Sequence, residues 1–579
     1  MCKKLLVLTF FVFVFALAGI AGASVSLPEI IGDNMVLQQG MDVPIWGTAN
    51  SGEQVTVDFD GQSKSTTAGG SGDWMVILDP MSASLTGKNM VITGDNSITL
   101  TDVWVGEVWV SSGQSNMNMS LGSGVYGADE AIADMVNHNI RRFKVDSAEW
   151  VLLTPSNGNQ ASAVHYFFAH ELAHNLGNIA GGMIETAVSG SGIEEWTHTN
   201  GCAGLLYEGR INPLQPYAIQ GAIWYQGETD FNWKSEFYYD RMVGLIGEWR
   251  SDWGQGDFPF GIVQLPWKTT HVELWPVVQD SQLRAHLDVV NTGLAVTWDL
   301  DPKGKGVHPY TKKPIGERLA LWARSQVYSQ SGFEYSGPIR DAQQSYVNGN
   351  EIVIAFDHIG AGLTTNQGGD PYPFKVAGSD GTYYDATGQI VGDTVVVSSP
   401  SVSEPVSVRF VWDYSQGDLY NVDGLPAAVF ELNLSGGSYC GDGTCDPGED
   451  QCNCPDDCGT PPSTETSCTD GIDNDCDTYT DCDDSDCDGD PACQPSYCGD
   501  GTCDPDEDQC NCPDDCGTPP STETSCDDGV DNDCDTYTDC DDSDCDGDPA
   551  CPDCVEKGGA CTADADCCSG DCLPAGKCK

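Results

Sequence analysis

Hydrophobic and polar residues alternate along the first hundred residues in the pattern of short β-strands. The alternation is clear in residues 43–47 and 54–58, and Gly, Asp and Asn separate such runs. A period of two is typical of strands that bury one face, and these residue types favour the turns between strands. We therefore expect a small β-domain over residues 24–100.

Between residues 101 and 334, apolar runs of strand length alternate with longer segments of helical pattern. This succession predicts an α/β domain with three α/β/α layers and a parallel sheet, whose site lies at the carboxyl ends of the strands. Strand patterns return over residues 335–436, for example in 351–356 and 394–397. The chain is thus expected to carry a central α/β domain flanked by two β-rich domains.

A serine follows one of the most apolar predicted strands. The run 103–110 leads into Gly113-Gln114-Ser115-Asn116. Glycine permits a tight bend, and a serine on such a turn can project its hydroxyl into a cleft. Because such turns are also common in ordinary loops, this segment alone predicts a nucleophile only weakly.

Two later segments supply the groups that a serine nucleophile requires. Residues 224–230 read Trp-Tyr-Gln-Gly-Glu-Thr-Asp, and residues 307–309 read Val-His-Pro shortly before a predicted helix. A histidine can take the hydroxyl proton, and polar donors can stabilise the oxyanion of an acyl-transfer reaction. The three segments together favour nucleophilic catalysis.

These segments resemble the sialate O-acetylesterases and their acetylxylan esterase relatives in the SGNH hydrolase superfamily. The resemblance covers about residues 27–434 and is carried by NMVLQ at 34–38, GQSN at 113–116, WYQGE at 224–228, GERLALWA at 316–323, VRFVW at 408–412 and GLPA at 424–427. It implies an SGNH hydrolase domain and a serine carbohydrate esterase that removes O-acetyl groups from glycans. The implied reaction passes through an acetyl-enzyme and needs no cofactor.

Matched residue by residue, the family pattern implies that Ser115 is the nucleophile and His308 the general base. The oxyanion would be held by the backbone N–H groups of Ser115 and Gly190 and by the side chain of Gln226. Gly190 corresponds to the second glycine of a GGT-like segment, in which Ser189 replaces the first glycine. The acetylated sugar is left open among sialic acid, xylan and pectin. Trp196, Trp224 and Trp233 are candidates for stacking on it, and core packing is the alternative, at least as common for aromatic residues.

The acid that orients the histidine departs from the family pattern. Relatives place an Asp two or three residues before the histidine, where this chain has Gly306 and Lys305. Any carboxylate that accepts the imidazole N–H would serve. The candidates are Glu228, Asp299 and Asp301, and the intact motif around Glu228 favours it. The alternative is that Glu228 only supports the loop of Gln226. Because the usual acid is missing, the alternative function is a carbohydrate-binding surface protein with impaired catalysis.

Residues 170–174, His-Glu-Leu-Ala-His, fit the HExxH pattern of zinc peptidases. A third metzincin ligand would fall at position 180, which is Ala, and Glu194 already belongs to the GGT-like segment. The surrounding residues 166–173 have the pattern of an amphipathic helix. We therefore expect an ordinary helix here rather than a peptidase.

The N-terminus has the pattern of a signal peptide over residues 1–23, with two lysines, an apolar run and small residues at 21–23. No second run of about twenty apolar residues follows, so we expect no membrane span and a secreted or cell-surface protein. The formal net charge of −63 opposes binding to nucleic acid, so we expect no nucleic-acid partner.

Cysteines concentrate in the last part of the chain, where 26 lie between Cys440 and Cys578, whereas Cys202 is the one other cysteine after the signal peptide. This distribution predicts disulfide-rich modules. Two acidic repeats, 437–495 and 496–552, share a period of 58 residues and hold 17 and 19 acidic residues. The end, 553–579, resembles a knottin.

Each acidic repeat contains a D-x-D-x-D-G string that suits Ca²⁺. The candidate ligands are Asp484, Asp486, Asp488, Asp542, Asp544 and Asp546. The alternative is an acidic, solvated surface held by disulfides alone. Either form leaves the tail open to a cell-surface or matrix partner.

Overall fold

The computed structural model describes residues 24–434, except 199–203, 232–233, 268–273, 301–303, 306 and 413–415, together with scattered residues between 451 and 578. It divides into two compact units, residues 1–439 and 440–579. Within the described ranges, no helix has the length and apolar character needed to cross a bilayer. The predicted signal peptide, Cys202 and Trp233 lie outside the described residues.

Six parallel strands form the centre of the first unit, in the order β8-β10-β7-β11-β12-β13, and β9 extends this sheet as an antiparallel edge strand. The strands are β7 (Ser97–Gly113), β8 (Ile140–Lys144), β9 (Glu149–Leu152), β10 (Ala180–Glu185), β11 (Gly221–Tyr225), β12 (Phe260–Val263) and β13 (Thr292–Ala295). Every residue of β10, β11, β12 and β13 is buried. Continuous burial is typical of a parallel sheet that is covered on both faces.

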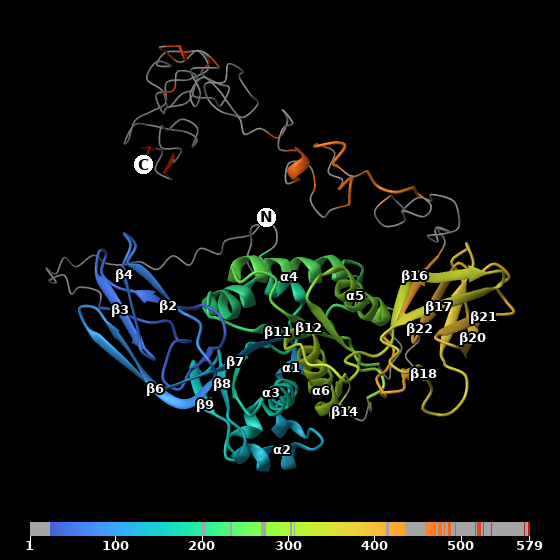
Figure 1. Ribbon diagram of the computed structural model, residues 1–579, viewed down its shortest axis with the longest axis horizontal. Helices are drawn as coiled ribbons and strands as arrows, with labels where there is room; N and C mark the ends of the chain where they lie inside the picture. The colour runs from blue at the N-terminus through green and yellow to red at the C-terminus, as the bar shows by residue number, and fades with distance from the viewer. Residues whose placement is uncertain are drawn as a thin grey trace. The chain divides into compact units, whose positions relative to one another are not determined.

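Helices lie on both sides of this sheet (Figure 1). The helices α3 and α6 pack against each other on one side, and α4 and α5 pack together on the other. Their bounds are α3 (Ala163–Asn175), α4 (Tyr238–Trp253), α5 (Trp275–Asp288) and α6 (Lys313–Trp322). Ser162 caps α3 by accepting a hydrogen bond from the His165 N–H, and Gly254 ends α4 at φ +66°. The predicted α/β class is confirmed.

The N-terminal strands join the central sheet through β7, a strand of 17 residues. Its first part pairs with β6 and its last part with β10 and β11, so the predicted boundary at residue 100 falls inside one strand. The other strands are β1 (Val36–Gln38), β2 (Val43–Thr48), β3 (Gln54–Phe59), β4 (Gln62–Thr67), β5 (Asp73–Leu78) and β6 (Ser84–Thr93). Of these, β3 and β5 alternate between buried and less buried residues as the sequence pattern predicts.

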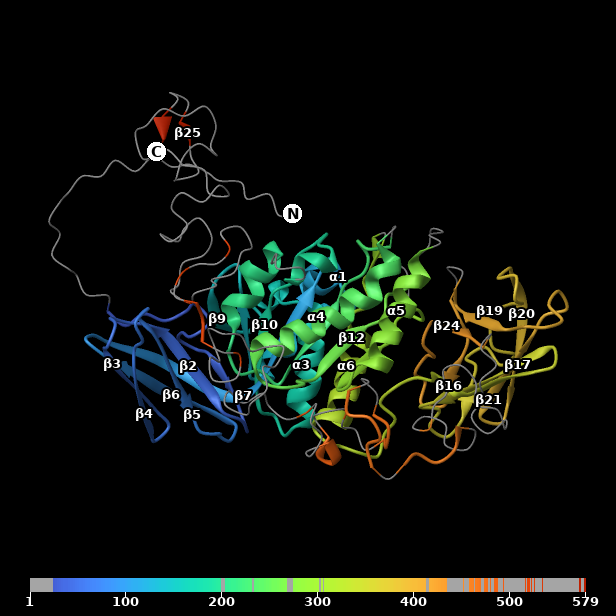
Figure 2. The ribbon, with the colours of Figure 1, turned by 90° about the horizontal axis from the view of Figure 1, so that it is seen from above.

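A seven-stranded antiparallel sheet follows α6, in the order β16-β17-β21-β20-β19-β22-β24. Its strands and the short pair β18–β23 are β16 (Ile339–Asn348), β17 (Glu351–Asp357), β18 (Leu363–Thr364), β19 (Phe374–Ala377), β20 (Tyr383–Val391), β21 (Thr394–Ser398), β22 (Ser407–Phe410), β23 (Tyr420–Asn421) and β24 (Phe430–Asn433). These strands and the N-terminal strands lie at opposite ends of the central domain (Figures 1 and 2).

In the second unit, a disulfide joins Cys468 to Cys487, and the short pair β25 (Cys572–Leu573) and β26 (Lys577–Cys578) is formed. Most of the two acidic repeats and of the knottin-like end lies outside the described residues. The predicted modules therefore stay predictions.

Candidate active site

The backbone at the end of β7 places Ser115 at the carboxyl edge of the sheet. Gly113 has φ +122°, and a Cβ atom there would lie 2.2 Å from the carbonyl oxygen of Tyr225, so only glycine fits. The next N–H, of Gln114, donates to that same carbonyl at 3.0 Å and ties the turn to β11. Ser115 then begins the short helix α1 (Ser115–Asn118).

His308 reaches Ser115 from the segment before α6. It lies in the short strand β15 (His308–Pro309), and its Nε2 atom is 2.8 Å from the Ser115 hydroxyl oxygen. This distance lies in the range over which a base accepts a hydroxyl proton. Both residues are partly exposed, so a substrate can reach the pair.

Two backbone N–H groups near Ser115 are available to an oxyanion. Among the described residues, no hydrogen bond uses the N–H of Ser115 or of Gly190. Gly190 lies exposed in the loop after β10 and has φ +82°, whereas Ser189 beside it does not have a positive φ. The left-handed conformation therefore falls on the glycine of this pair, where it costs little.

Gln226 differs from its predicted position as an oxyanion donor. The side chain is fully buried, and its amide nitrogen lies within hydrogen-bonding distance of Gln114 Oε1 (3.1 Å), the Ser191 carbonyl (3.0 Å) and Asp230 Oδ2 (2.5 Å). An amide carries only two N–H hydrogens, so these partners already use its donors. Gln226 thereby links the turn before Ser115 to the loop that carries Gly190.

Glu228 also differs from the prediction that its carboxylate contacts the catalytic histidine. Its side chain is buried, and Oε1 accepts a hydrogen bond from the amide of Asn116. The same amide donates to the Val307 carbonyl at 2.9 Å, directly before His308. Within the described part of the chain, no hydrogen bond joins Glu228 to His308. The carboxylate thus reaches the histidine segment only through Asn116, which the sequence pattern did not single out.

Lys312 completes this buried network and was not predicted. It has no exposed surface, its ammonium group donates to Asn116 Oδ1, and it lies 4.9 Å from the centre of the Tyr225 ring. Burial raises the pKa of the Glu228 carboxyl and lowers the pKa of the Lys312 ammonium, and the attraction between the two charges opposes both changes. In the sequence, the one signal is a lysine four residues after the histidine at the start of an amphipathic helix.

The two upstream acid candidates have different outcomes. Asp299 forms a bidentate ion pair with Arg318, with N–O distances of 2.7 and 2.6 Å, so its carboxylate is already committed. Asp301 lies outside the described residues.

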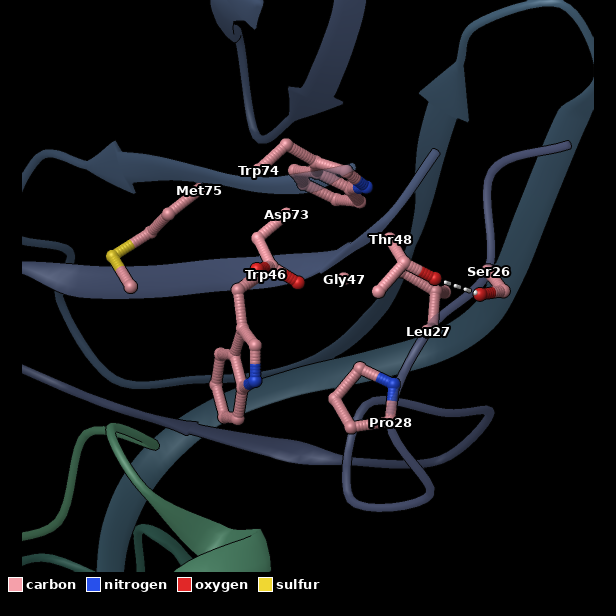
Figure 3. A pocket seen from close by; sticks show the side chains of 9 residues that line it. All are labelled: Ser26, Leu27, Pro28, Trp46, Gly47, Thr48, Asp73, Trp74 and Met75. Carbon is pink, nitrogen blue, oxygen red and sulfur yellow. Dashed lines mark hydrogen bonds between the residues drawn. The ribbon is translucent and has the colours of Figure 1, made fainter. Parts of the chain in front are cut away.

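The tryptophans suggested for sugar stacking are core residues where the structure describes them. Trp196 and Trp224 are fully buried and pack edge to face, with ring centres 5.9 Å apart. They support the strands beneath the site rather than facing a ligand. A surface pocket of about 570 Å³ on the N-terminal strands is lined instead by Trp46, Trp74 and Asp73 (Figure 3). No catalytic candidate lines it.

In the acidic tail, only Asp484 and Asp486 of the six predicted calcium ligands are described. The Asp486 N–H donates to Asp484 Oδ1 at 2.7 Å. The carboxylates that converge in this region are those of Glu465, Asp473 and Asp475. Because the other four predicted ligands lie outside the described residues, the calcium hypothesis stays a prediction.

The comparisons with known proteins agree with this geometry. A family model described as carbohydrate esterase, sialic acid-specific acetylesterase, matches residues 105–323. Sialate O-acetylesterases of Homo sapiens and Rattus norvegicus are 27% and 26% identical to this chain, covering 55% of it in each case and 74% and 76% of those proteins.

A solved structure extends the likeness beyond the matched domain. The crystal structure of a carbohydrate acetylesterase from Xanthomonas citri is 32% identical, has a TM-score of 0.65 and aligns with 71% of this chain and 99% of its own. Such identity over nearly all of that protein shows common ancestry, and the relatives are carboxylic ester hydrolases. The chain therefore belongs to the sialic acid-specific acetylesterase family of carbohydrate esterases.

Proposed function

We propose that this protein is a secreted serine esterase that removes O-acetyl groups from glycans, with O-acetylated sialic acid as its first candidate substrate. The observation that carries the mechanism is the 2.8 Å hydrogen bond between Ser115 Oγ and His308 Nε2 at the carboxyl end of β7. The names of the curated relatives support the sialate substrate. The apolar N-terminal run supports secretion.

In the first step, Ser115 Oγ attacks the carbonyl carbon of the acetyl ester while His308 Nε2 takes the hydroxyl proton. The N–H groups of Ser115 and Gly190 hold the oxyanion of the tetrahedral intermediate, a contribution of about 2.7–4 kcal/mol per donor in a well-studied serine enzyme. The bond to the sugar oxygen then breaks, and His308 returns the proton to that oxygen. The products are the free sugar hydroxyl and acetyl-Ser115.

In the second step, water attacks the acetyl carbonyl while His308 again takes a proton. The bond to Ser115 Oγ breaks, the proton returns to the serine, and acetate leaves. No step requires a metal or a cofactor, as in other esterases of this family.

The buried group of Asn116, Glu228 and Lys312 positions the catalytic pair. Asn116 directly follows the nucleophile and donates to the carbonyl of Val307, directly before the base. Glu228 accepts a hydrogen bond from the nitrogen of the Asn116 amide, and Lys312 donates one to its oxygen. The two residues therefore fix the orientation of that amide. We assign the acid of the triad to Asp301, since Glu228 and Asp299 are committed to other partners.

The direct test is acetate release from O-acetylated sialic acid and from acetylxylan by wild type, Ser115→Ala and Ser123→Ala. Ser123 is the matched control, because it is exposed and its hydroxyl bonds only to Ser120 among the described residues. We expect Ser115→Ala to lose nearly all activity and Ser123→Ala to keep it.

Equal activity of Ser115→Ala and wild type would overturn the serine mechanism. A preference for acetylxylan would overturn the sialate assignment and leave the mechanism standing. The alternative of an impaired binding protein would gain support only if the wild type released no acetate from either glycan.

A further inference from the structure

Three side chains that can bind a metal converge at a place that the esterase mechanism does not use. Asp134 ends the helix α2 (Ala128–Asp134), His138 follows it directly after one 3-10 turn, and His170 lies on α3. Asp134 Oδ2, His138 Nε2 and His170 Nε2 all lie within 4.8 Å of one another. We propose that they bind one divalent transition-metal ion of the zinc class.

The three ligand atoms lie within about 0.6 Å of the spacing in a tetrahedral site, where bonds of about 2.0–2.2 Å place ligand atoms about 3.3–3.6 Å apart. His138 Nε2 is 2.7 Å from Asp134 Oδ2 and 2.9 Å from His170 Nε2, and His170 Nε2 is 3.8 Å from the same carboxylate oxygen. A circle through three points with these separations has a radius of about 1.9 Å, slightly less than the zinc bond lengths of about 2.0–2.2 Å. An ion just outside the plane of the three atoms therefore reaches all of them without a large movement.

Hydrogen bonding alone satisfies this group poorly. His138 Nε2 faces a carboxylate oxygen, which only accepts, and also a second imidazole nitrogen. If Nε2 carries a proton, that single proton must serve both neighbours; if it does not, its lone pair faces the carboxylate. The other ring nitrogen, Nδ1, is buried and has no hydrogen-bond partner among the described residues. A cation between the three atoms converts these lone-pair contacts into bonds.

The site has room for a further ligand. Asp134 and His170 border a pocket of about 530 Å³, which Glu130, Tyr166 and Lys313 also line. A zinc ion with three protein ligands takes water or another small ligand in its fourth position. The side chains of Asp134 and His170 are 49% and 29% exposed, so an ion can enter from solvent.

The ion would act as a structural tie beside the catalytic base. It links the α2 segment to α3, and α3 packs against α6. Directly before α2, the Tyr126 N–H donates to the Tyr310 carbonyl at 3.1 Å, two residues after His308. The loaded site therefore holds the α2 segment in place against the loop that carries the base.

This site differs from the HExxH hypothesis although it shares one histidine with it. His174 is exposed, and within the described residues it joins no group of converging ligands. His170 finds its partners on the α2 segment, more than 30 residues upstream, rather than one helical turn away. The site therefore belongs to a different ligand set from that of the zinc peptidases.

The test uses the full chain, purified without a polyhistidine tag and stripped with EDTA, and titrated with Zn²⁺ alone against a colorimetric chelator. Wild type is compared with His170→Ala and with His174→Ala, the matched control from the same helix. We expect wild type and His174→Ala to bind one more tight Zn²⁺ per chain than His170→Ala. Zinc bound by the cysteine-rich tail is common to all three and cancels in the difference.

A second measurement uses the wild type alone, so its result does not depend on whether His170→Ala folds. Crystals of the wild type soaked in Zn²⁺ should show an anomalous peak at the zinc edge between Asp134, His138 and His170, with bonds of about 2.0–2.2 Å. Equal zinc stoichiometry in wild type and in folded His170→Ala would overturn the proposal, as would the absence of that peak. Because the esterase steps use no metal, loss of this site and loss of the serine mechanism are separate outcomes.

Discussion

At the scale of single residues, the site depends on buried charged side chains. Lys312 and Glu228 are both buried, and Asn116 lies between them with one hydrogen bond to each. Within the described residues, no direct salt bridge joins Glu228 to Lys312, and their opposite charges interact across the Asn116 amide. Leaving one buried charge uncompensated costs about 3–5 kcal/mol. Removing both charges at once avoids that cost.

We therefore expect Lys312→Met to lower the free energy of unfolding by roughly 3–5 kcal/mol, because Glu228 loses its cation. The double variant Glu228→Gln/Lys312→Met should recover a large part of this loss. Urea denaturation of wild type, Glu228→Gln, Lys312→Met and the double variant measures both effects. A double variant as unstable as the sum of the two single variants would contradict the coupling.

The roles proposed for Asp301 and Glu228 predict different effects on turnover. A triad acid that holds the histidine contributes about 10⁴-fold to kcat, so we expect a loss of that order in Asp301→Asn. Glu228→Gln keeps an acceptor for the Asn116 amide and should lose far less. Steady-state kinetics on one acetyl ester, with both variants checked for folding, decide between them. A larger loss in Glu228→Gln would return the role of the acid to Glu228.

At the scale of elements, the junction between α5 and the C-terminal sheet contains a titrating carboxyl. Asp280 on α5 accepts a hydrogen bond from the Glu431 N–H on β24 at 2.9 Å. Burial raises the pKa of Asp280 from 3.8 to about 6, and this hydrogen bond and the nearby Arg340 oppose the change. The unfolded chain ionises this carboxyl near pH 4, whereas the folded chain ionises it only near pH 6. The free energy of unfolding therefore falls as the pH rises from about 4 to 6.

Asp280→Asn should remove this pH dependence while keeping the hydrogen-bond acceptor. We expect the unfolding free energy of the variant, relative to wild type, to rise by roughly 1–3 kcal/mol between about pH 4 and 6.5. Asp240→Asn, an exposed carboxyl on α4, is the control. A difference between Asp280→Asn and wild type that stays constant with pH would contradict the assignment.

The elements also show how far the sequence could predict the site. Ser115 and His308 were predictable because the GQSN turn and the Val-His-Pro segment match the family pattern, whereas the turn alone indicated a nucleophile only weakly. Gln226 and Glu228 were correctly placed near the site but not in contact with its reacting atoms. Asn116 and Lys312 lie between Glu228 and the histidine segment. Their place there depends on packing between segments nearly 200 residues apart, which the local sequence does not show.

The ordinary helix expected over residues 166–173 is present as part of α3, whereas the suggested stacking role of two tryptophans is not supported. The sequence around a tryptophan does not show whether its ring faces a ligand or the core. Trp196 and Trp224 face the core. The spacing of His170 and His174 suggested a shared metal, but the partners of His170 come from another helix. Local periodicity predicts which face of a helix is buried. It does not predict which side chains of other elements contact the helix.

At the scale of the whole molecule, the catalytic and tail regions differ in chemistry. The family match ends at residue 323, and every residue assigned to the reaction lies within it. The two acidic repeats supply 36 of the chain's acidic residues and contain no Lys or Arg. Such a charge density repels anionic partners at low ionic strength.

We expect a chain of residues 24–436 to keep the kcat of the full protein on a small neutral acetyl ester within about twofold, since the tail carries no group of the mechanism. On polyanionic acetylated glycans, the full chain should show the higher KM at low salt, and the difference should fade as salt is added. Parallel kinetics of both chains at two salt concentrations test this. A large drop in kcat on truncation would show that the tail contributes to the site.

The central claim is that Ser115 carries the acetyl group between two half-reactions. It is tested most directly by rapid quenching of the full chain with an activated acetyl ester, followed by peptide mass spectrometry. We expect the mass of one acetyl group on the peptide that contains Ser115, formed before the steady state and absent from Ser115→Ala. Full turnover without that adduct, or an adduct on another residue, would contradict the mechanism.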